Sequence, residues 1–203
     1  MTITNGYATL AEFKAYVTVR GGSTSTDAAD DAVIEDLIEA VSRQIDNLTG
    51  RRFVAESSDS TRYFEAKDGK CEIDELSTTP TSISVDYSGI RTYTALTAAD
   101  YELLPDNASA KGLPYDAIII APASSAYFPE GRKGVKIIGK FGWPSVPDNI
   151  KSGCLAVCHN WWMERSGQAS SGKVTVTASG VVIRPEDIPP HVMSDLLSLR
   201  VYR

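Results

Sequence analysis

Apolar residues recur at helical intervals near the start of the chain. Leu10, Phe13 and Val17 lie three and four positions apart, which predicts a short helix that Thr9 opens. The glycine pair at 21–22 closes this helix, and a polar connector follows it to residue 26.

A longer helix is predicted after this connector. Thr26 and Asp27 precede it, and their side-chain oxygens can accept hydrogen bonds from the free amides of a first helical turn. Gly50 supplies a C-terminal cap. The helix has one continuous apolar stripe, formed by Ile34, Leu37, Ile38, Val41, Ile45 and Leu48.

The middle of the chain, from about Arg62 to Phe141, changes to short runs of β-branched and aromatic residues. Turn-forming pairs such as Asp68-Gly69 and Ser88-Gly89 separate these runs. The pattern predicts a small, mostly antiparallel sheet. Its expected strand segments are Tyr63–Phe64, Ile83–Val85, Tyr101–Leu103, Ala117–Ile120 and Val135–Phe141.

Helical spacing returns after Pro147 and Asp148 in a segment so apolar that we expect it to be buried. Alternating valine and threonine at 174–177, a turn at 178–180 and an apolar run at 181–183 predict a β-hairpin or arm. A last amphipathic helix begins at the proline pair 189–190.

These patterns predict an α+β protein. We expect a single domain over residues 1–203, built as a helical bundle with an inserted antiparallel β-rich section at 62–141. Residues 168–203 are expected to form a C-terminal tether, arm and docking helix.

Composition narrows the classes of function. The 203 residues are 42% hydrophobic, enough for one sizeable core, and the three cysteines do not suggest a disulfide framework. No secretion signal or membrane span is apparent, so we expect a soluble cytosolic protein. A net charge of −6 argues against general affinity for the nucleic-acid backbone.

Two motifs resemble chemical sites, but each has a simpler interpretation. Gly134 to Lys140 has the glycine and lysine spacing of a phosphate-binding loop, yet its β-branched interior predicts an ordinary strand. Cys154, Cys158 and His159 resemble part of a metal site, but no supporting ligand motif accompanies them, so buried core cysteines are favoured. We therefore predict no cofactor, no metal and no enzymatic activity.

Arginine and aromatic residues, which are enriched at protein interfaces, concentrate in two places. Trp161 and Trp162 point about 100° apart on a helix, so either the chain itself covers a wide arc of this helix or a partner covers part of it. The residues considered for contact between copies are Arg51, Arg52, Trp161, Trp162 and Arg165.

A basic turn, Gly131-Arg132-Lys133-Gly134, lies between two predicted strands. The simpler interpretation is a solvated hairpin tip. Contact with a phosphate or an acidic partner is the alternative.

Four segments together resemble the head-tail connector (adaptor) family of tailed bacteriophages and gene-transfer particles. They are Thr9–Val17, Ile45–Phe53, Pro147–Lys151 leading into Trp161–Arg165, and the chain end from Ile188. The resemblance implies a ring, typically a dodecamer, that sits beneath the portal protein, extends the DNA channel and supports the next neck protein.

The resemblance also suggests roles for individual residues. In the family the C-terminal segment docks on the portal, which here corresponds to Ile188, Val192, Leu196, Leu197, Leu199, Arg200, Tyr202 and Arg203. Acidic residues of the long helix are candidates to flank the channel, where DNA would pass without specific binding: Asp30, Asp31, Glu35, Asp36 and Glu39.

The expected partners are therefore the portal protein, neighbouring copies of the chain, and a stopper or tail-completion protein. The expected location is the virion neck, with assembly in the host cytoplasm. A stopper or tail-completion protein is the alternative identity for the chain itself, and an enzyme with an unrecognised site and a nucleic-acid-binding module are further alternatives.

Overall fold

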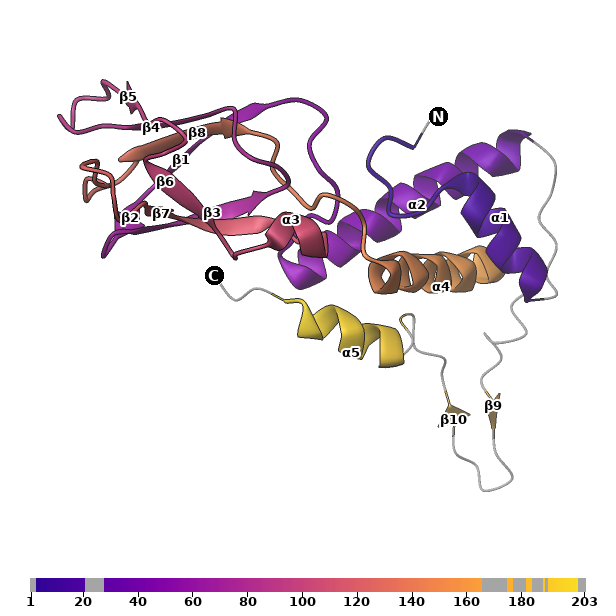
Figure 1. Ribbon diagram of the computed structural model, residues 1–203. Helices are drawn as coiled ribbons and strands as arrows, with labels where there is room; N and C mark the ends of the chain where they lie inside the picture. Colours follow the sequence, from indigo (N-terminus) through magenta and orange to yellow (C-terminus); the bar gives the residue numbers. More distant parts are fainter. Residues whose placement is uncertain are drawn as a thin grey trace. The chain divides into compact units, whose positions relative to one another are not determined.

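The structure is a computed structural model that describes residues 3–20, 28–165, 175–176, 182–183, 188 and 190–200. The chain divides into two compact units, a helical unit of residues 1–51 and 146–203 and a β-unit of residues 52–145 (Figure 1). Helices and two antiparallel four-stranded sheets occur together, so the predicted α+β class is confirmed.

The helical unit contains the four helices that the apolar spacing predicts. They are α1 (Leu10–Val19), α2 (Ala28–Thr49), α4 (Asp148–Arg165) and α5 (Pro190–Ser198). Thr9 caps α1 in a reciprocal box with Glu12, in which each side chain bonds the other residue's backbone amide. The positive φ of Gly50, 68°, ends α2 as expected.

Helix α4 is the centre of this unit and contacts α1, α2 and α5. Residues 153–158 are buried without interruption, and six consecutive residues span more than one full helical turn. This confirms the prediction of a buried helix. A Cβ at Gly153 would lie 3.0 Å from Val192 Cγ1, so α5 approaches α4 closely at this point.

The predicted hairpin is confirmed for four residues, because β9 (Thr175–Val176) pairs antiparallel with β10 (Val182–Ile183). The predicted tether at 168–172 and the caps Thr26 and Asp27 lie outside the described residues.

The β-unit is a sandwich of two sheets. One sheet has the order β1-β8-β4-β5, and the other has the order β2-β3-β7-β6. The strands of the first are β1 (Ser60–Phe64), β8 (Val135–Gly139), β4 (Ser82–Val85) and β5 (Thr94–Ala95), and those of the second are β2 (Ala66–Lys67), β3 (Lys70–Leu76), β7 (Tyr115–Ile120) and β6 (Tyr101–Leu104).

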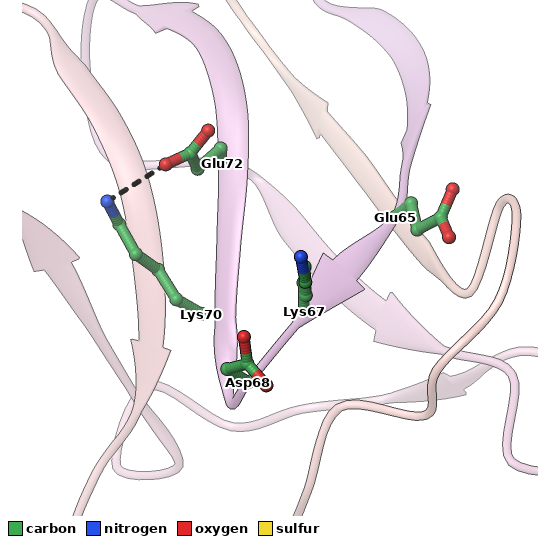
Figure 2. A pocket seen from close by; sticks show the side chains of 5 residues that line it. All are labelled: Glu65, Lys67, Asp68, Lys70 and Glu72. Carbon is green, nitrogen blue, oxygen red and sulfur yellow. Dashed lines mark hydrogen bonds and ion pairs between the residues drawn. The ribbon is translucent and has the colours of Figure 1, made fainter.

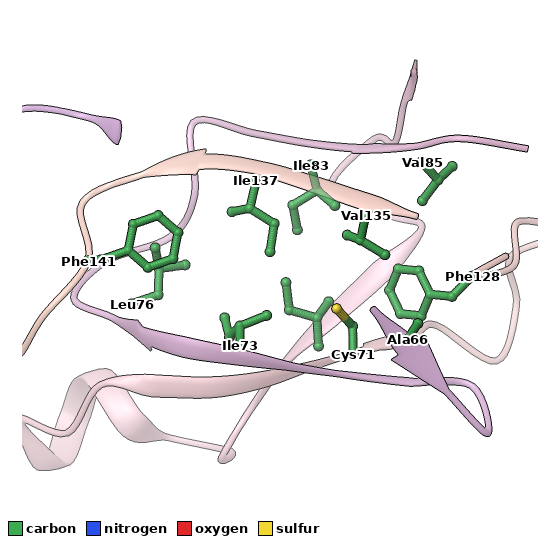
Figure 3. Packing of buried hydrophobic residues seen from close by; sticks show 11 residues of the cluster. Ala66, Cys71, Ile73, Leu76, Ile83, Val85, Phe128, Val135, Ile137 and Phe141 are labelled. Atoms are coloured by element: carbon green, nitrogen blue, oxygen red, sulfur yellow. The ribbon is translucent and has the colours of Figure 1, made fainter. Parts of the chain in front are cut away.

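The inner faces of the two sheets form one apolar core (Figure 3). Ile83 and Ile137 come from the first sheet, and Ile73 and Ile118 come from the second. Complete burial of each such side chain contributes about 1.5–3 kcal/mol. The alternating positions between these buried residues point outward, so each sheet also presents an outer face.

The β-unit has two sheets where the sequence analysis expected one, and strand β3 was not predicted. Polar residues occupy most of β3, and only Cys71, Ile73 and Leu76 of this strand are buried. The short helix α3 (Ala108–Lys111) was also missed. The Asp68-Gly69 turn was recognised, and its φ angles of 52° and 77° match a tight two-residue hairpin between β2 and β3.

Candidate interaction surfaces

The C-terminal helix buries its apolar side within the helical unit. Ile188, Val192 and Leu196 are 8%, 5% and 1% exposed, and α5 contacts α2 and α4. The amphipathic pattern of α5 is therefore already satisfied by the chain itself. Portal docking through these three side chains would require them to leave this packing.

The other predicted docking residues differ in their exposure. Leu197 is 45% exposed and Arg200 is exposed, whereas Leu199 is half-buried. The Leu199 carbonyl accepts a hydrogen bond from Arg51 Nε at 2.6 Å, which ties the end of α5 to the second residue after α2. Tyr202 and Arg203 lie outside the described residues.

The structure separates the two tryptophans of α4. Trp162 is 8% exposed, whereas Trp161 is only half-buried. The chain itself thus covers Trp162 and part of Trp161, and the exposed part of Trp161 is left for a partner. Arg52 is half-buried in the β-unit, and the side chain of Arg165 is not described.

The acidic residues of α2 are partly engaged inside the helical unit. Asp31 pairs with Lys14 at 2.6 Å. Glu39 Oε1 accepts the backbone amides of Thr4 and Asn5, which lowers the pKa of the Glu39 carboxyl. Asp30 and Glu35 are half-buried, and Asp36 is exposed. The group is therefore not one uniform solvated acidic face.

Cys154 and Cys158 lie side by side in the core of the helical unit, with their sulfurs 3.9 Å apart. The Cys154 sulfur is also 3.7 Å from Ser42 Oγ, which accepts the amide of Tyr7. The hydrogen bond with Cys154 and burial raise the pKa of the Cys158 thiol. Within the described part of the chain, no three His, Cys, Asp or Glu residues are placed to hold a metal ion.

The outer face of the β1-β8-β4-β5 sheet carries a row of lysine and tyrosine side chains. Lys133 Nζ lies 5.7 Å from the Tyr63 ring centre, and Lys136 Nζ lies 4.8 Å from that of Tyr93. The two tyrosine rings are 5.8 Å apart. We call this group, together with Arg91 and Arg132, the tyrosine–lysine face.

Hydrogen bonds fix the basic turn, which contributes Arg132 and Lys133 to this face. Arg91 Nη1 donates to the carbonyls of Arg132 and Lys133 at 2.7 and 3.1 Å, and the Tyr93 hydroxyl also donates to Lys133. The turn is therefore fixed by two side chains of the β4–β5 loop. Residues 131–133 of the turn are exposed, which is consistent with the simpler interpretation of a solvated turn.

Asp86 organises the β4–β5 loop that supplies Arg91 and Tyr93. Its carboxylate accepts the amides of Gly89 and Arg91 and the hydroxyl of Ser88. Burial raises the pKa of the Asp86 carboxyl, but the hydrogen bond from Arg91 and those from Ser88 and Gly89 outweigh it, so the pKa lies below its ordinary value.

Among the described residues, the basic side chains of the tyrosine–lysine face are not held in ion pairs. In the described part of the chain, Arg91, Arg132, Lys133 and Lys136 form no ion pair with a carboxylate. Large exposed apolar side chains lie in or beside the same strands and loops: Tyr63 is 46%, Tyr87 38%, Ile90 75% and Tyr127 58% exposed. Exposed aromatic and cationic groups together are typical of a contact surface.

A charged hollow of about 410 Å³ lies at the β2–β3 hairpin of the other sheet (Figure 2). It is lined by three carboxylates and two ammonium groups, from Glu65, Asp68, Glu72, Lys67 and Lys70. Lys70 and Glu72 form an exposed ion pair at 3.2 Å. Glu102 is exposed on β6, in register with Lys70 through Ile119 of β7.

Sequence reasoning identified the basic turn but not the face that it belongs to. Tyr63 and Lys136 are direct cross-strand partners of β1 and β8. The alternation of Lys136 with the buried Val135 and Ile137 was the available signal for its outward direction. The pairing of the strands was not available from the sequence, so the residues could not be grouped.

No protein-family model and no curated protein sequence matches this chain. Its fold is similar to that of a chain in the neck of an empty gene transfer agent (GTA) particle, computed with C6 symmetry. The TM-score is 0.54 at 18% identity, covering 100% of this chain and 94% of that chain. A chain of the native GTA virion gives a TM-score of 0.52 with the same identity and coverage.

A third match is a chain in the neck of a native GTA particle computed with C12 symmetry. Its TM-score is 0.51 at 18% identity, covering 100% of this chain and 93% of that chain. These similarities extend over the whole chain, so they concern both units. At this identity they establish a shared fold. Separately, no helix in the described ranges has the length and apolar character to cross a membrane.

Proposed function

We propose that this protein is a structural head-tail connector (adaptor) subunit, which forms a ring under the portal, extends the DNA channel and supports the next neck protein. The observation that carries the proposal is the full-length similarity of fold to GTA chains, two of them from neck structures. The four sequence segments that resemble the adaptor family point in the same direction. A non-enzymatic role is part of this proposal.

The proposed docking element is the C-terminal segment. Among the predicted docking residues that the structure describes, Leu197 and Arg200 are exposed, so they lie on the surface that a portal could contact. The buried residues Ile188, Val192 and Leu196 hold α5 in position. Arg51 contributes to the same purpose through its bond to Leu199.

The test is cryo-electron microscopy of this protein mixed with the portal protein of the same genome. We expect added symmetric density on the tail-facing end of the portal. A bare portal, with both proteins folded, contradicts the adaptor role and favours a stopper or tail-completion protein further along the neck.

A pair of variants tests the docking element itself. Leu197→Asp with Arg200→Glu should abolish the added density, because it places negative charge on the exposed side of α5. The matched control is Leu113→Asp with Lys111→Glu, which changes another exposed apolar and basic pair, in the β-unit. Equal loss of density in both variants would contradict docking through α5.

A further inference from the structure

The outer faces of the β-sandwich differ in charge. The tyrosine–lysine face carries Arg91, Arg132, Lys133 and Lys136, and none of these pairs with a carboxylate in the described ranges. On the other sheet, Glu65, Asp68, Glu72 and Glu102 are exposed and outnumber the neighbouring Lys67 and Lys70. We call the outer side of the β2-β3-β7-β6 sheet the acidic face.

These two faces point in opposite directions, because the sheets pack their inner sides against the shared core. A surface cannot contact its complement within the same sandwich. It can do so between copies, where the tyrosine–lysine face of one copy meets the acidic face of the next. Such a contact is heterologous, so each copy retains one free face and the contact can repeat around a ring.

We propose that the tyrosine–lysine face binds the acidic face of a second copy of this chain. The hollow is lined by Glu65, Asp68 and Glu72 against Lys67 and Lys70, so carboxylates are in excess there, and Lys133 is exposed at the tip of its turn. The tyrosine rings add apolar contact area at low entropic cost. This inference rests on the proposed function only in its expectation that the contacts close into a ring.

Nucleic acid is the other polyanion that a lysine and tyrosine surface could bind. The net charge of the whole chain is −6, which repels the negatively charged phosphates of DNA at long range. A second copy offers a local acidic surface on the same scaffold. The observations therefore favour contact between copies.

The test uses charge reversal and mixing of full-length variants, with association measured by analytical ultracentrifugation. K133E/K136E reverses the basic side and E72K/E102K reverses the acidic side. Each alone should weaken self-association on the order of tenfold or more at low salt, because like charges then face each other. An equal mixture of the two should restore association, since both possible contacts then join opposite charges.

The matched control is R20E/K111E, which makes the same change in net charge at exposed basic residues outside the tyrosine–lysine face. It should associate like the wild type, and wild-type association should weaken with added salt. Circular dichroism checks that every variant is folded.

Three outcomes overturn the inference. They are a wild type that stays monomeric at low salt and high concentration, an unaffected K133E/K136E variant, and a mixture without rescue. A monomeric wild type that shifts a DNA duplex, with K133E/K136E losing the shift, would instead assign the face to nucleic acid. The portal density measures a different contact, so failure of either experiment leaves the other result standing.

Discussion

Helix α5 and the tyrosine–lysine face both carry apolar side chains, but those of α5 are buried and those of the face are exposed. The apolar side of α5 is closed by α2 and α4, so Leu196 is 1% exposed. The tyrosines of the β-unit remain open, and Tyr63 is 46% exposed with an ammonium group above its ring. The comparison shows that an apolar stripe predicts which side is to be covered, but does not say what covers it.

The largest expected difference between the two surfaces is in stability. Leu196→Ala should lower the free energy of unfolding by about 2–5 kcal/mol, because it leaves a cavity beneath α5. Tyr63→Ala should cost less than about 1 kcal/mol, since it removes only cross-strand contacts on an open face. Urea titrations followed by circular dichroism measure both, and equal losses would contradict the comparison.

The covered side also depends on buried polar groups. Ser42→Ala removes the acceptor of the Tyr7 amide, so a buried N–H is left without its partner. The expected loss is about 1–3 kcal/mol of unfolding free energy. Ser152→Ala is the control, because Ser152 is exposed on α4, and it should change stability by less than about 0.5 kcal/mol.

The open face should respond to acid through Asp86. Because the folded-state pKa of this carboxyl is lowered, its stabilising contribution is present above the unfolded pKa and disappears as the pH falls through the folded value. Asp86→Asn should therefore lower the melting temperature at neutral pH, by less than Ser42→Ala does. The difference from wild type should vanish in acid, and a difference that persists there would contradict this role.

The smallest expected effect concerns the lysines themselves. Lys136→Gln should change the free energy of unfolding by less than about 0.5 kcal/mol, because a single cation over an open tyrosine ring contributes little. The same variant should weaken association between copies. A large loss of stability would instead make the tyrosine–lysine face a structural feature of the β-unit.

The sequence was most informative where one local pattern determines one element. Leu10, Phe13 and Val17 were enough to predict α1, and Gly50 was enough to end α2. Strand β3 was missed because Lys70, Glu72, Asp74 and Glu75 mask the alternation of its buried residues.

The candidate surfaces were less predictable because they depend on contacts between distant segments. The helices that contact α5 are α2 and α4, and the partners of Lys133 lie on β1 and the β4–β5 loop. Neither distribution follows from local propensity. The portal-docking, ring-interface and channel-lining residues therefore remain predictions, and the Leu197 and Arg200 variant tests the portal-docking group.

The three cysteines allow the opening of each unit to be measured by thiol alkylation. Cys71 lies in the core of the β-unit, and Cys154 and Cys158 lie in that of the helical unit, all fully buried. Burial raises the pKa of Cys71 to about 12, so little reactive thiolate is present near neutral pH. Alkylation at Cys71 then times the opening of the sandwich, and alkylation at Cys154 or Cys158 times the opening around α4. A cysteine added at the surface for a fluorophore would react first, because the three native cysteines do not react until a unit opens.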